Sequence, residues 1–193
     1  MGGRAEGSWT FPGGQARQAG VATPLEPSAV LVTGVYGSGK STVVADIGAL
    51  LESEGEPYGL VDVDWLSWFD VGAGPELNQR VAFSNLNAIC SAYVEVGVRR
   101  LALAWAIRDR AQLEATRAAV GVPLTVVRLD IDEDTVRDRL GSDPTQERRE
   151  ADLRVAMDWL SNGHGVGLAD FEISGTSRVR QISEQICRHL GWV

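Results

Sequence analysis

One stretch decides the fold of this 193-residue chain: Gly34-Val35-Tyr36-Gly37-Ser38-Gly39-Lys40-Ser41-Thr42. It fits the pattern GxxxxGK(S/T), in which glycines let the backbone curl until successive N–H groups point inward. Those donors and the positive end of the following helix form a site for phosphate. An apolar run at 29–33 and helical spacing at 41–54 supply the strand and the helix that such a loop needs. The sequence therefore predicts a nucleotide-binding loop.

Side chains of this loop have separate expected roles. Lys40 is the only lysine of the chain, and we expect it to reach the β- and γ-phosphates, because a compact charge on a flexible stem is needed there. The Ser41 hydroxyl is expected to bind Mg²⁺. The other loop residues expected to contact the nucleotide are Gly34, Tyr36, Gly37, Ser38, Gly39 and Thr42.

The composition narrows the possible partners. The formal net charge is −8, from 26 acidic and 18 basic side chains, whereas nucleic-acid binding needs a surplus of Lys and Arg. No apolar run reaches the roughly 18 residues of a membrane span, and no secretory-signal pattern opens the sequence. We therefore expect a cytoplasmic protein with neither nucleic acid nor membrane as a partner. Cys90 and Cys187 lie in apolar helical stretches, which predicts two buried free thiols.

The first part of the chain differs from the rest. Residues 1–27 are rich in Gly, Ala, Gln and Pro without a sustained period, which predicts a disordered leader. The alternative is a segment that docks on the core through Trp9 and Phe11. Residues 28–193 are expected to form one domain.

That domain alternates apolar runs with amphipathic stretches, which is typical of an α/β protein with a mostly parallel five-stranded sheet between helical layers. We expect ligands beyond the carboxyl ends of the strands. The expected strands are 29–33, 58–63, 100–107, 123–129 and 168–173. The expected helices are 41–54, 77–96, 109–120, 132–140, 148–161 and 177–190.

Two acids end the second expected strand, in Val61-Asp62-Val63-Asp64. The period of two puts both carboxylates on one side of the strand, near the phosphate loop. One acid is able to hold Mg²⁺ through water, and the other is able to accept a proton from a substrate hydroxyl. The alternative is a pair of solvated acids at a strand end.

With these motifs the chain resembles the small P-loop kinases, among them adenylylsulfate, shikimate and gluconate kinases and chloramphenicol phosphotransferase. The resemblance implies a three-layer P-loop NTPase fold that uses ATP and Mg²⁺. It also implies that Asp62 is the acid on the metal side and that Asp64 is the base on the substrate side. In that family an Asp-x-Asp after the second strand has these two roles.

The resemblance further implies a lid around residues 141–150 that closes on the triphosphate. Arginines bracket this region, and the phrase Thr135–Leu140 resembles the helix that leads into the lid of the family. We therefore expect Arg139 and Arg148 to stabilise the transferring charge. The alternative for Arg148 and its neighbours is a solvated helix start.

The acceptor region is expected between the second strand and the following helix. Trp65 and Trp68 are candidate walls of the pocket, although core packing is an equal alternative. Further candidates for acceptor binding are Asp64, Arg80, Asn85 and Arg108, with helix capping as the alternative for the adjacent Asp109. In related kinases the turn at Ser174 and Thr176 lies along the adenine.

The leading hypothesis is an ATP-dependent kinase that phosphorylates a hydroxyl of a small metabolite or antibiotic, acting as a monomer or homodimer. A nucleoside or nucleotide kinase is the second. A regulatory nucleotide-binding module is the third, because the strand at 100–107 does not end in the acid of an ordinary Walker B motif.

Overall fold

The computed structural model describes residues 26–69, 71–72, 74–141 and 146–193, with the side chains of 146–149 excepted. Parallel strands alternate with helices along the chain, as the apolar periodicity predicts. The strands are β1 (Ser28–Thr33), β2 (Tyr58–Asp62), β3 (Arg100–Ala104), β4 (Leu124–Asp130) and β5 (Phe171–Ser174). The helices are α1 (Lys40–Glu54), η1 (Val63–Ser67, a 3-10 turn), α2 (Pro75–Glu95), α3 (Arg110–Val120), α4 (Glu133–Gly141), α5 (Gln146–Ser161) and α6 (Val179–His189).

The sheet has the order β2-β3-β1-β4-β5, and each of these neighbouring pairs is parallel. The predicted α/β fold is therefore confirmed, with a wholly rather than mostly parallel sheet. Strand β1 lies at the centre, where Val32 pairs with Ala104 on one side and Val127 on the other. Its residues from Ala29 to Thr33 are all buried, because helices cover both faces of the sheet.

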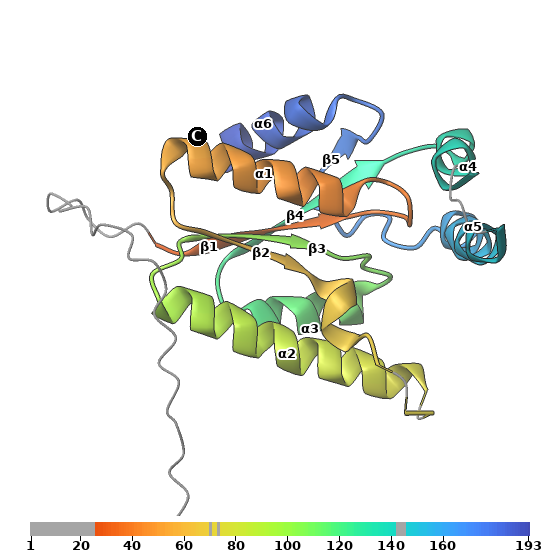
Figure 1. The fold of residues 1–193 in the computed structure, drawn as a ribbon, viewed down its shortest axis with the longest axis horizontal. Helices are drawn as coiled ribbons and strands as arrows, with labels where there is room; N and C mark the ends of the chain where they lie inside the picture. The colour runs from red at the N-terminus through yellow and green to blue at the C-terminus, as the bar shows by residue number, and fades with distance from the viewer. Residues whose placement is uncertain (1–25, 70, 73, 142–145) are drawn as a thin grey trace, which may run out of the picture.

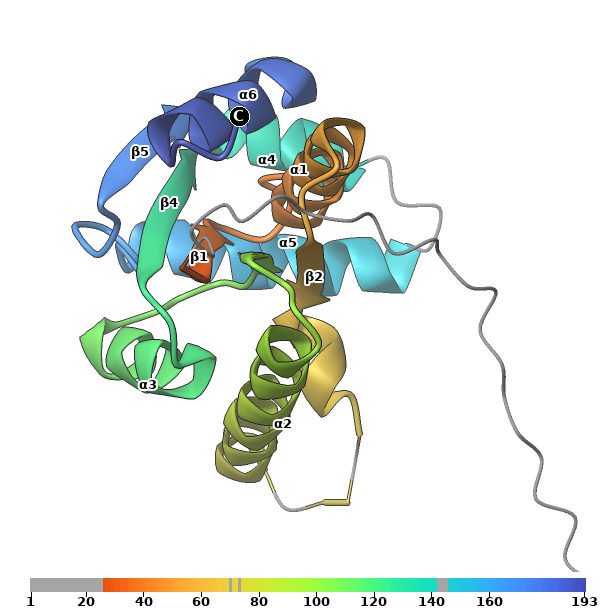
Figure 2. The same cartoon turned by 90° about the vertical axis from the view of Figure 1, so that its left-hand side faces the viewer.

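Two helical layers enclose the sheet (Figure 1). Helices α1 and α6 lie on one face, and α2 and α3 lie on the other, as the end-on view makes plain (Figure 2). Successive residues of a strand point to opposite faces, so Val30 packs in the core under α1 and α6 while Leu31 packs in the core over α2 and α3.

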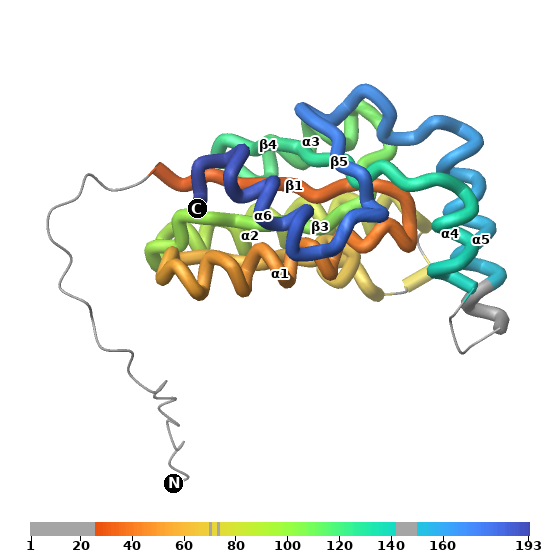
Figure 3. The backbone as a smooth tube through the Cα atoms, turned by 90° about the horizontal axis from the view of Figure 1, so that it is seen from above, coloured from red at the N-terminus to blue at the C-terminus, as the bar shows by residue number. Residues whose placement is uncertain are grey.

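Helices α4 and α5 cover the end of the sheet to which the strands point (Figure 3). A third, smaller core joins them to the phosphate loop through the buried side chains of Val35, Val136 and Trp159. The end of the molecule where the sequence predicts ligand binding is therefore enclosed by residues far from the loop in the sequence.

Two strands differ from their predicted bounds by three residues at one end, and the others by one residue at one or both ends. Strand β3 ends at Ala104 rather than at residue 107, because its partner β1 ends at Thr33, whose hydroxyl accepts the Ile107 N–H at 2.9 Å. Strand β5 begins at Phe171 rather than at 168. The Asp170 carboxylate accepts the Val126 N–H at 2.7 Å, and the Asp170 N–H donates to the Val126 carbonyl oxygen at 2.9 Å, so a side-chain hydrogen bond accompanies the backbone one just before the strand.

Several predictions meet the limits of what is described. Residues 1–25 of the expected leader, with Trp9 and Phe11, lie outside the described residues, as do residues 142–145 of the expected lid. The first residues of the expected helix 148–161 fall within α5, which starts two residues earlier, at Gln146. Among the described helices, none is both long and apolar enough to cross a membrane.

Cys90 and Cys187 are buried free thiols as predicted, and burial raises the pKa of each to about 11.

The core of β1 yields a stability prediction. Val30 is 0% exposed in the central strand, whereas Val96 is 80% exposed at the end of α2. We expect Val30→Ala to lower the free energy of unfolding by about 2 kcal/mol, since it removes two buried methyl-sized groups and leaves a cavity. Val96→Ala should change it by less than about 0.5 kcal/mol. Urea denaturation of both variants checks this, and equal effects would contradict the described core.

Candidate functional site

The phosphate loop leaves the start of α1 open. Gly39 is the N-cap of α1 with a positive φ of 96°, and no side chain caps the helix. The first N–H groups of the helix therefore point into the loop without a side-chain acceptor, which is the arrangement that binds phosphate. Gly37 also has a positive φ, 81°, and a Cβ atom there would lie 3.0 Å from the Leu140 side chain. Both glycines are needed for the loop to close beneath α4.

Two loop residues predicted to contact the nucleotide, Ser38 and Gly34, do not line the cavity formed by the phosphate loop and the start of α1, which we call the phosphate cradle. Ser38 is 2% exposed, and within the described part of the chain its hydroxyl has no hydrogen-bond partner. Gly34 allows a close approach, because a Cβ atom at its position would lie 2.8 Å from the Leu129 carbonyl oxygen and 2.9 Å from Ser38 Oγ. Neither Gly34 nor Ser38 lines the phosphate cavity, which is lined by the other loop residues predicted to contact the nucleotide.

The side chain of Lys40 is buried at the centre of the site. It is 7% exposed, and its Nζ atom donates to the Val35 carbonyl oxygen at 3.1 Å across the loop. Burial lowers the pKa of Lys40, while the charges of Asp64 and Asp62 raise it. The ammonium group thus lies between the loop and both acids, where a phosphate would give it the anionic partner it lacks in the loop.

Asp62 is joined directly to the phosphate loop. The Ser41 hydroxyl donates to Asp62 Oδ2 at 2.6 Å. Mg²⁺ prefers oxygen ligands and is usually held by one or two protein groups together with water and substrate phosphates, so this oxygen pair fits the ion. No group of three or more His, Cys, Asp or Glu side chains gathers anywhere in the described ranges. The protein would hold Mg²⁺ through Ser41 and Asp62.

Asp64 lies near the loop for a different reason from the predicted one. It follows the end of β2 and belongs to η1, so strand alternation does not position it. Its backbone N–H donates to Asp62 Oδ1 at 3.2 Å, which turns the chain. The residue as a whole is exposed, but its carboxyl group lies close enough to Lys40, Asp62 and the Trp105 side chain for each to affect its pKa. Burial raises the pKa of Asp64, against the opposing effects of Lys40 and of a hydrogen bond from the Trp105 side chain.

Arg139 lies across the loop from the acids. Its guanidinium donates to the carbonyl oxygens of Ser38 at 3.0 Å and Gly175 at 2.7 Å. It joins α4, the phosphate loop and the turn after β5. The Arg148 side chain lies outside the described residues. Arg139 and Asp64 face one cavity of about 350 Å³, which is lined by Tyr36, Gly37, Gly39, Lys40, Ser41, Thr42, Asp64, Arg139 and Leu140.

A second cavity continues from this one on the far side of Arg139. It has a volume of about 370 Å³ and runs between the start of α1 and the start of α6. Gly175 and Ser177 line it, whereas the predicted Ser174 and Thr176 do not; their hydroxyl groups are 2.8 Å apart and exposed. The predicted turn lines this cavity, through Gly175 and Ser177 instead of Ser174 and Thr176. Its position beside the phosphate loop suits the base of a nucleotide.

Other cavities lie on the opposite side of Asp64. One of about 340 Å³ is lined by Tyr36, Asp64, Trp105, Ala106, Arg108, Gln112, Val155 and Trp159. Its neighbour of about 410 Å³ is lined by Pro75, Glu76, Gln79, Trp105, Arg108, Asp109 and Gln112. Because Tyr36 and Asp64 also line the phosphate cavity, that cavity and the one of about 340 Å³ meet at these two residues.

Of the residues predicted for the acceptor, the structure brings Asp64 and Arg108 to these cavities. Trp65 and Trp68 are 65% and 68% exposed and lie against each other, with ring centroids 4.6 Å apart. They line none of the described cavities, because the 3-10 turn directs them outward. Their predicted role as pocket walls is therefore not supported by the geometry.

Two further acceptor candidates lie on α2, away from these cavities. Arg80 is exposed and lines none of those described. The Asn85 side-chain amide donates to the Leu66 carbonyl oxygen at 2.6 Å, so it ties η1 to α2. The Asp109 side chain accepts the Gln112 N–H at 2.8 Å and caps α3.

The sequence interpretation missed Trp105, Gln112 and Trp159. Trp105 immediately follows β3, so the rule that ligands bind at the carboxyl ends of parallel strands points to it. Trp159 carries no such signal, because packing of α5 against the end of the sheet brings it to the site.

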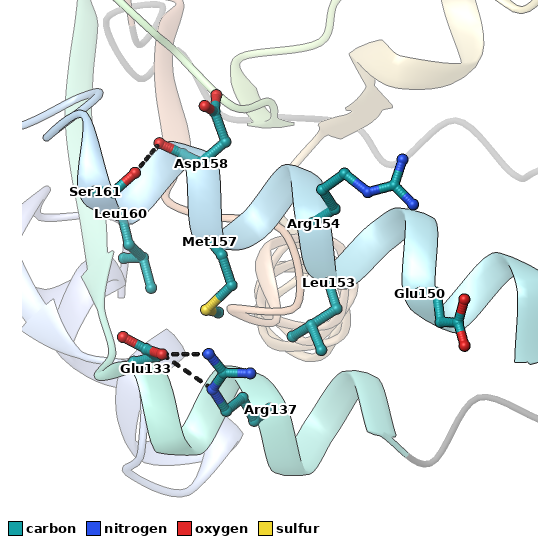
Figure 4. Close-up of a pocket in the computed structure, with 9 residues that line it drawn as sticks. All are labelled: Glu133, Arg137, Glu150, Leu153, Arg154, Met157, Asp158, Leu160 and Ser161. Atoms are coloured by element: carbon teal, nitrogen blue, oxygen red, sulfur yellow. Dashed lines mark hydrogen bonds and ion pairs between the residues drawn. The ribbon is translucent and has the colours of Figure 1, made fainter.

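A cavity of about 740 Å³, larger than the four described above, lies elsewhere, in the groove between α4 and α5 (Figure 4). Its lining contains no residue of the phosphate loop and neither acid. Figure 4 shows Arg137 paired with Glu133 there, on a face of α4 that does not meet the phosphate cavity.

Comparison with solved structures identifies the fold. A sugar kinase from Janibacter sp. HTCC2649 aligns with a TM-score of 0.64 at 15% identity, over 86% of this chain and 96% of that one. Shikimate kinase from Acinetobacter baumannii gives 0.58 at 20% identity, over 86% and 94%. A Deinococcus radiodurans tunicamycin resistance protein gives 0.59 at 16% identity, over 87% and 97%. No protein-family model and no curated protein sequence matches the chain. The fold is that of the P-loop small-molecule kinases, which confirms the predicted resemblance.

Because the pKa of Asp64 is raised, replacing its carboxyl group is expected to increase stability in a pH-dependent way. Its pKa is raised in the folded protein, so its ionisation opposes folding. That unfavourable contribution is complete above the raised pKa and disappears as the pH falls below the ordinary value of 3.8. We expect Asp64→Asn to raise the free energy of unfolding at neutral pH and to lose this advantage in acid.

Urea denaturation across this pH range, without nucleotide, checks the effect. Asp138→Asn is the matched control, because Asp138 is an exposed carboxylate on α4. A gain for Asp64→Asn that persists at the acid end would contradict the buried position of the carboxyl group.

Two arginines of α4 provide a second test of the site. Arg139 faces the phosphate loop, whereas Arg137 pairs with Glu133 on another face of the same helix. We expect Arg139→Gln to weaken binding of an ATP analogue about tenfold or more, since a charged hydrogen bond contributes roughly 1.5–3 kcal/mol. Arg137→Gln should leave the affinity unchanged. Calorimetric titration of both variants measures this, and equal affinities would rule out a nucleotide contact by Arg139.

Proposed function

We propose that the chain is an ATP-dependent kinase that transfers the γ-phosphate to a hydroxyl group of a small metabolite or antibiotic. One observation carries the proposal: Asp64 lines both the phosphate cavity and the next cavity, at the boundary between them. A carboxylate at such a boundary lies within reach of the terminal phosphate and of an acceptor.

The donor half of the reaction uses the phosphate cradle. The open N–H groups at the start of α1 bind phosphate oxygens, and Lys40 neutralises the charge on the terminal phosphates. Arg139 approaches from the other side of the loop. When bound through Ser41 and Asp62, Mg²⁺ supplies further charge neutralisation. The protein contribution is mainly position and charge, as is usual in phosphoryl transfer.

The acceptor half uses Asp64 as a base. Its carboxylate takes the proton of the acceptor hydroxyl while the hydroxyl oxygen forms a bond to the γ-phosphorus, and the bond from that phosphorus to the bridging oxygen of ADP breaks. The raised pKa of Asp64 makes it a better proton acceptor than an ordinary carboxylate. The hydrogen bond from the Trp105 side chain orients the carboxyl group.

The names of the structural neighbours fit this acceptor class. They include a sugar kinase, a shikimate kinase and a tunicamycin resistance protein, so the fold serves both metabolites and resistance to an antibiotic. The proposal includes a cytoplasmic location and a lid around residues 141–150 in which Arg148 assists Arg139.

A nucleotide-binding module with little turnover is the competing function. One observation favours it: Trp105 follows β3 directly, where an ordinary Walker B strand ends in an acid. Asp62 weakens the argument for this competing function, because it brings a carboxylate to Ser41 from β2 instead of from β3.

The decisive variant is Asp64→Asn. We expect it to lower kcat about a hundredfold to ten-thousandfold, the usual contribution of a general base, and to leave ATP affinity within about threefold. ADP formation with a panel of hydroxylated metabolites and antibiotics measures this, with Asp138→Asn as the control. Full turnover by Asp64→Asn would remove the base from the mechanism. Tight ATP binding without product from any acceptor would favour the regulatory module.

A further inference from the structure

Arg108 lines both cavities on the acceptor side of Asp64. Its backbone is held at both ends, since its N–H donates to Gln112 Oε1 at 2.8 Å and its carbonyl oxygen accepts the Gly165 N–H at 3.1 Å. The loop after β3 is therefore tied to α3 and to the segment after α5. These two hydrogen bonds fix the backbone of Arg108 at the edge of the site, so that its side chain starts from a defined position.

The guanidinium group of Arg108 has no carboxylate partner in the described part of the chain. Its central carbon lies over the Trp159 ring, 5.7 Å from the centroid, and no acid lies within ion-pair distance. The nearby carboxylate of Asp109 accepts the backbone N–H of Gln112. Asp64 lines one of these cavities, and Glu76 and Asp109 line the other, but none of them forms an ion pair with Arg108. In a chain with a net charge of −8, an arginine that faces a cavity and has no carboxylate partner is well suited to bind an external anion.

The walls between Asp64 and Arg108 are aromatic. Trp105 and Trp159 are each 8% exposed, so their rings are fixed in the core and present only a small surface to the cavity. Tyr36 adds a third ring at the boundary with the phosphate loop. The volume of about 340 Å³ suits a small molecule, and flat aromatic walls favour a ring with an apolar face.

From this arrangement we infer the chemical class of the acceptor, given the kinase function proposed above. It is a small hydroxylated ring compound that carries an anionic group, either a carboxylate or a phosphate. The ring packs against Trp105 and Trp159, its hydroxyl group meets Asp64, and its anion pairs with Arg108. Arg108 is thus a residue that determines acceptor specificity, in place of Arg80 and Asn85 on α2.

Binding is measured with a non-transferable ATP analogue and Mg²⁺ present, so that it does not depend on turnover. The probes are hydroxybenzoates and hydroxylated cyclohexanecarboxylates beside their methyl esters, and sugar phosphates beside the free sugars. The indole N–H signals of Trp105 and Trp159 report the site in NMR spectra, and Trp105→Phe and Trp159→Phe assign them. We expect anionic probes to bind at least about tenfold more tightly than their neutral counterparts. The two probe series distinguish carboxylate from phosphate.

Variants then link the preference to one side chain. Arg108→Gln should abolish the difference between anionic and neutral probes, and Arg108→Lys should restore part of it. Arg110→Gln is the control, because Arg110 is exposed on α3 and lines none of these cavities. Unchanged melting temperatures establish that the variants are folded.

The outcomes separate this inference from the proposed kinase. Equal binding of anionic and neutral probes, no indole shift with any anionic probe, or an unchanged preference in Arg108→Gln would each overturn it. ATP-dependent phosphorylation of neutral acceptors without an anion preference would leave the kinase standing and refute the inference. Anion-selective binding that depends on Arg108 supports the anion-binding role of this side chain, and a failure of every anionic probe to yield ADP would then contradict the kinase and not the Arg108 site.

Discussion

Lys40 holds its ammonium group inside the protein, where burial opposes the charge and the carboxylates of Asp62 and Asp64 favour it. Removing an ammonium group from water is unfavourable unless opposite charges surround it. The two acids provide part of that compensation, and a bound polyphosphate would provide more. The cradle, the acids and the helix start of α1 form one electrostatic unit, so a change in any of them alters the others.

The parallel sheet explains how so many chain segments reach this unit. Every strand runs in the same direction, so the segments that follow β1, β2, β3 and β5 emerge at one edge. The phosphate loop, the two acids, Trp105 and Gly175 come from these four segments. Helices α4 and α5 close over the same edge and add Arg139 and Trp159. The all-parallel architecture thereby fixes the positions of these segments along one edge, from the turn at Gly175 to the acids after β2.

The donor half of this site could be predicted from sequence because its signals are local. The loop, its helix and Lys40 are contiguous, and Asp62 ends a strand whose period is visible. The acceptor half could not, because long-range packing determines it. Trp65 and Trp68 point outward owing to a 3-10 turn stabilised by Asp62, which strand alternation does not anticipate.

The same contrast explains two other differences. Trp159 reaches the cavity through packing between helices, and no pattern within α5 indicates this. The end of β3 and the start of β5 differ from the prediction where the Thr33 hydroxyl and the Asp170 carboxylate accept backbone N–H groups, which hydrophobic periodicity does not reveal. Regular elements were thus predictable to within a few residues, and the walls of the acceptor cavity were not.

The amide of Asn85 connects α2 to the turn that carries Asp64, through the Leu66 carbonyl. The backbone of Arg108, in contrast, is fastened to α3 through Gln112 and to Gly165. Under the proposed mechanism, divergence in α2 would disturb the base and lower turnover. Divergence at Trp105 would also disturb the base, because its side chain donates a hydrogen bond to Asp64. Divergence at residues 106–108 would change which molecules are accepted and leave the base in position. The chain therefore offers evolution one independent route to a new substrate, through the segment 106–108.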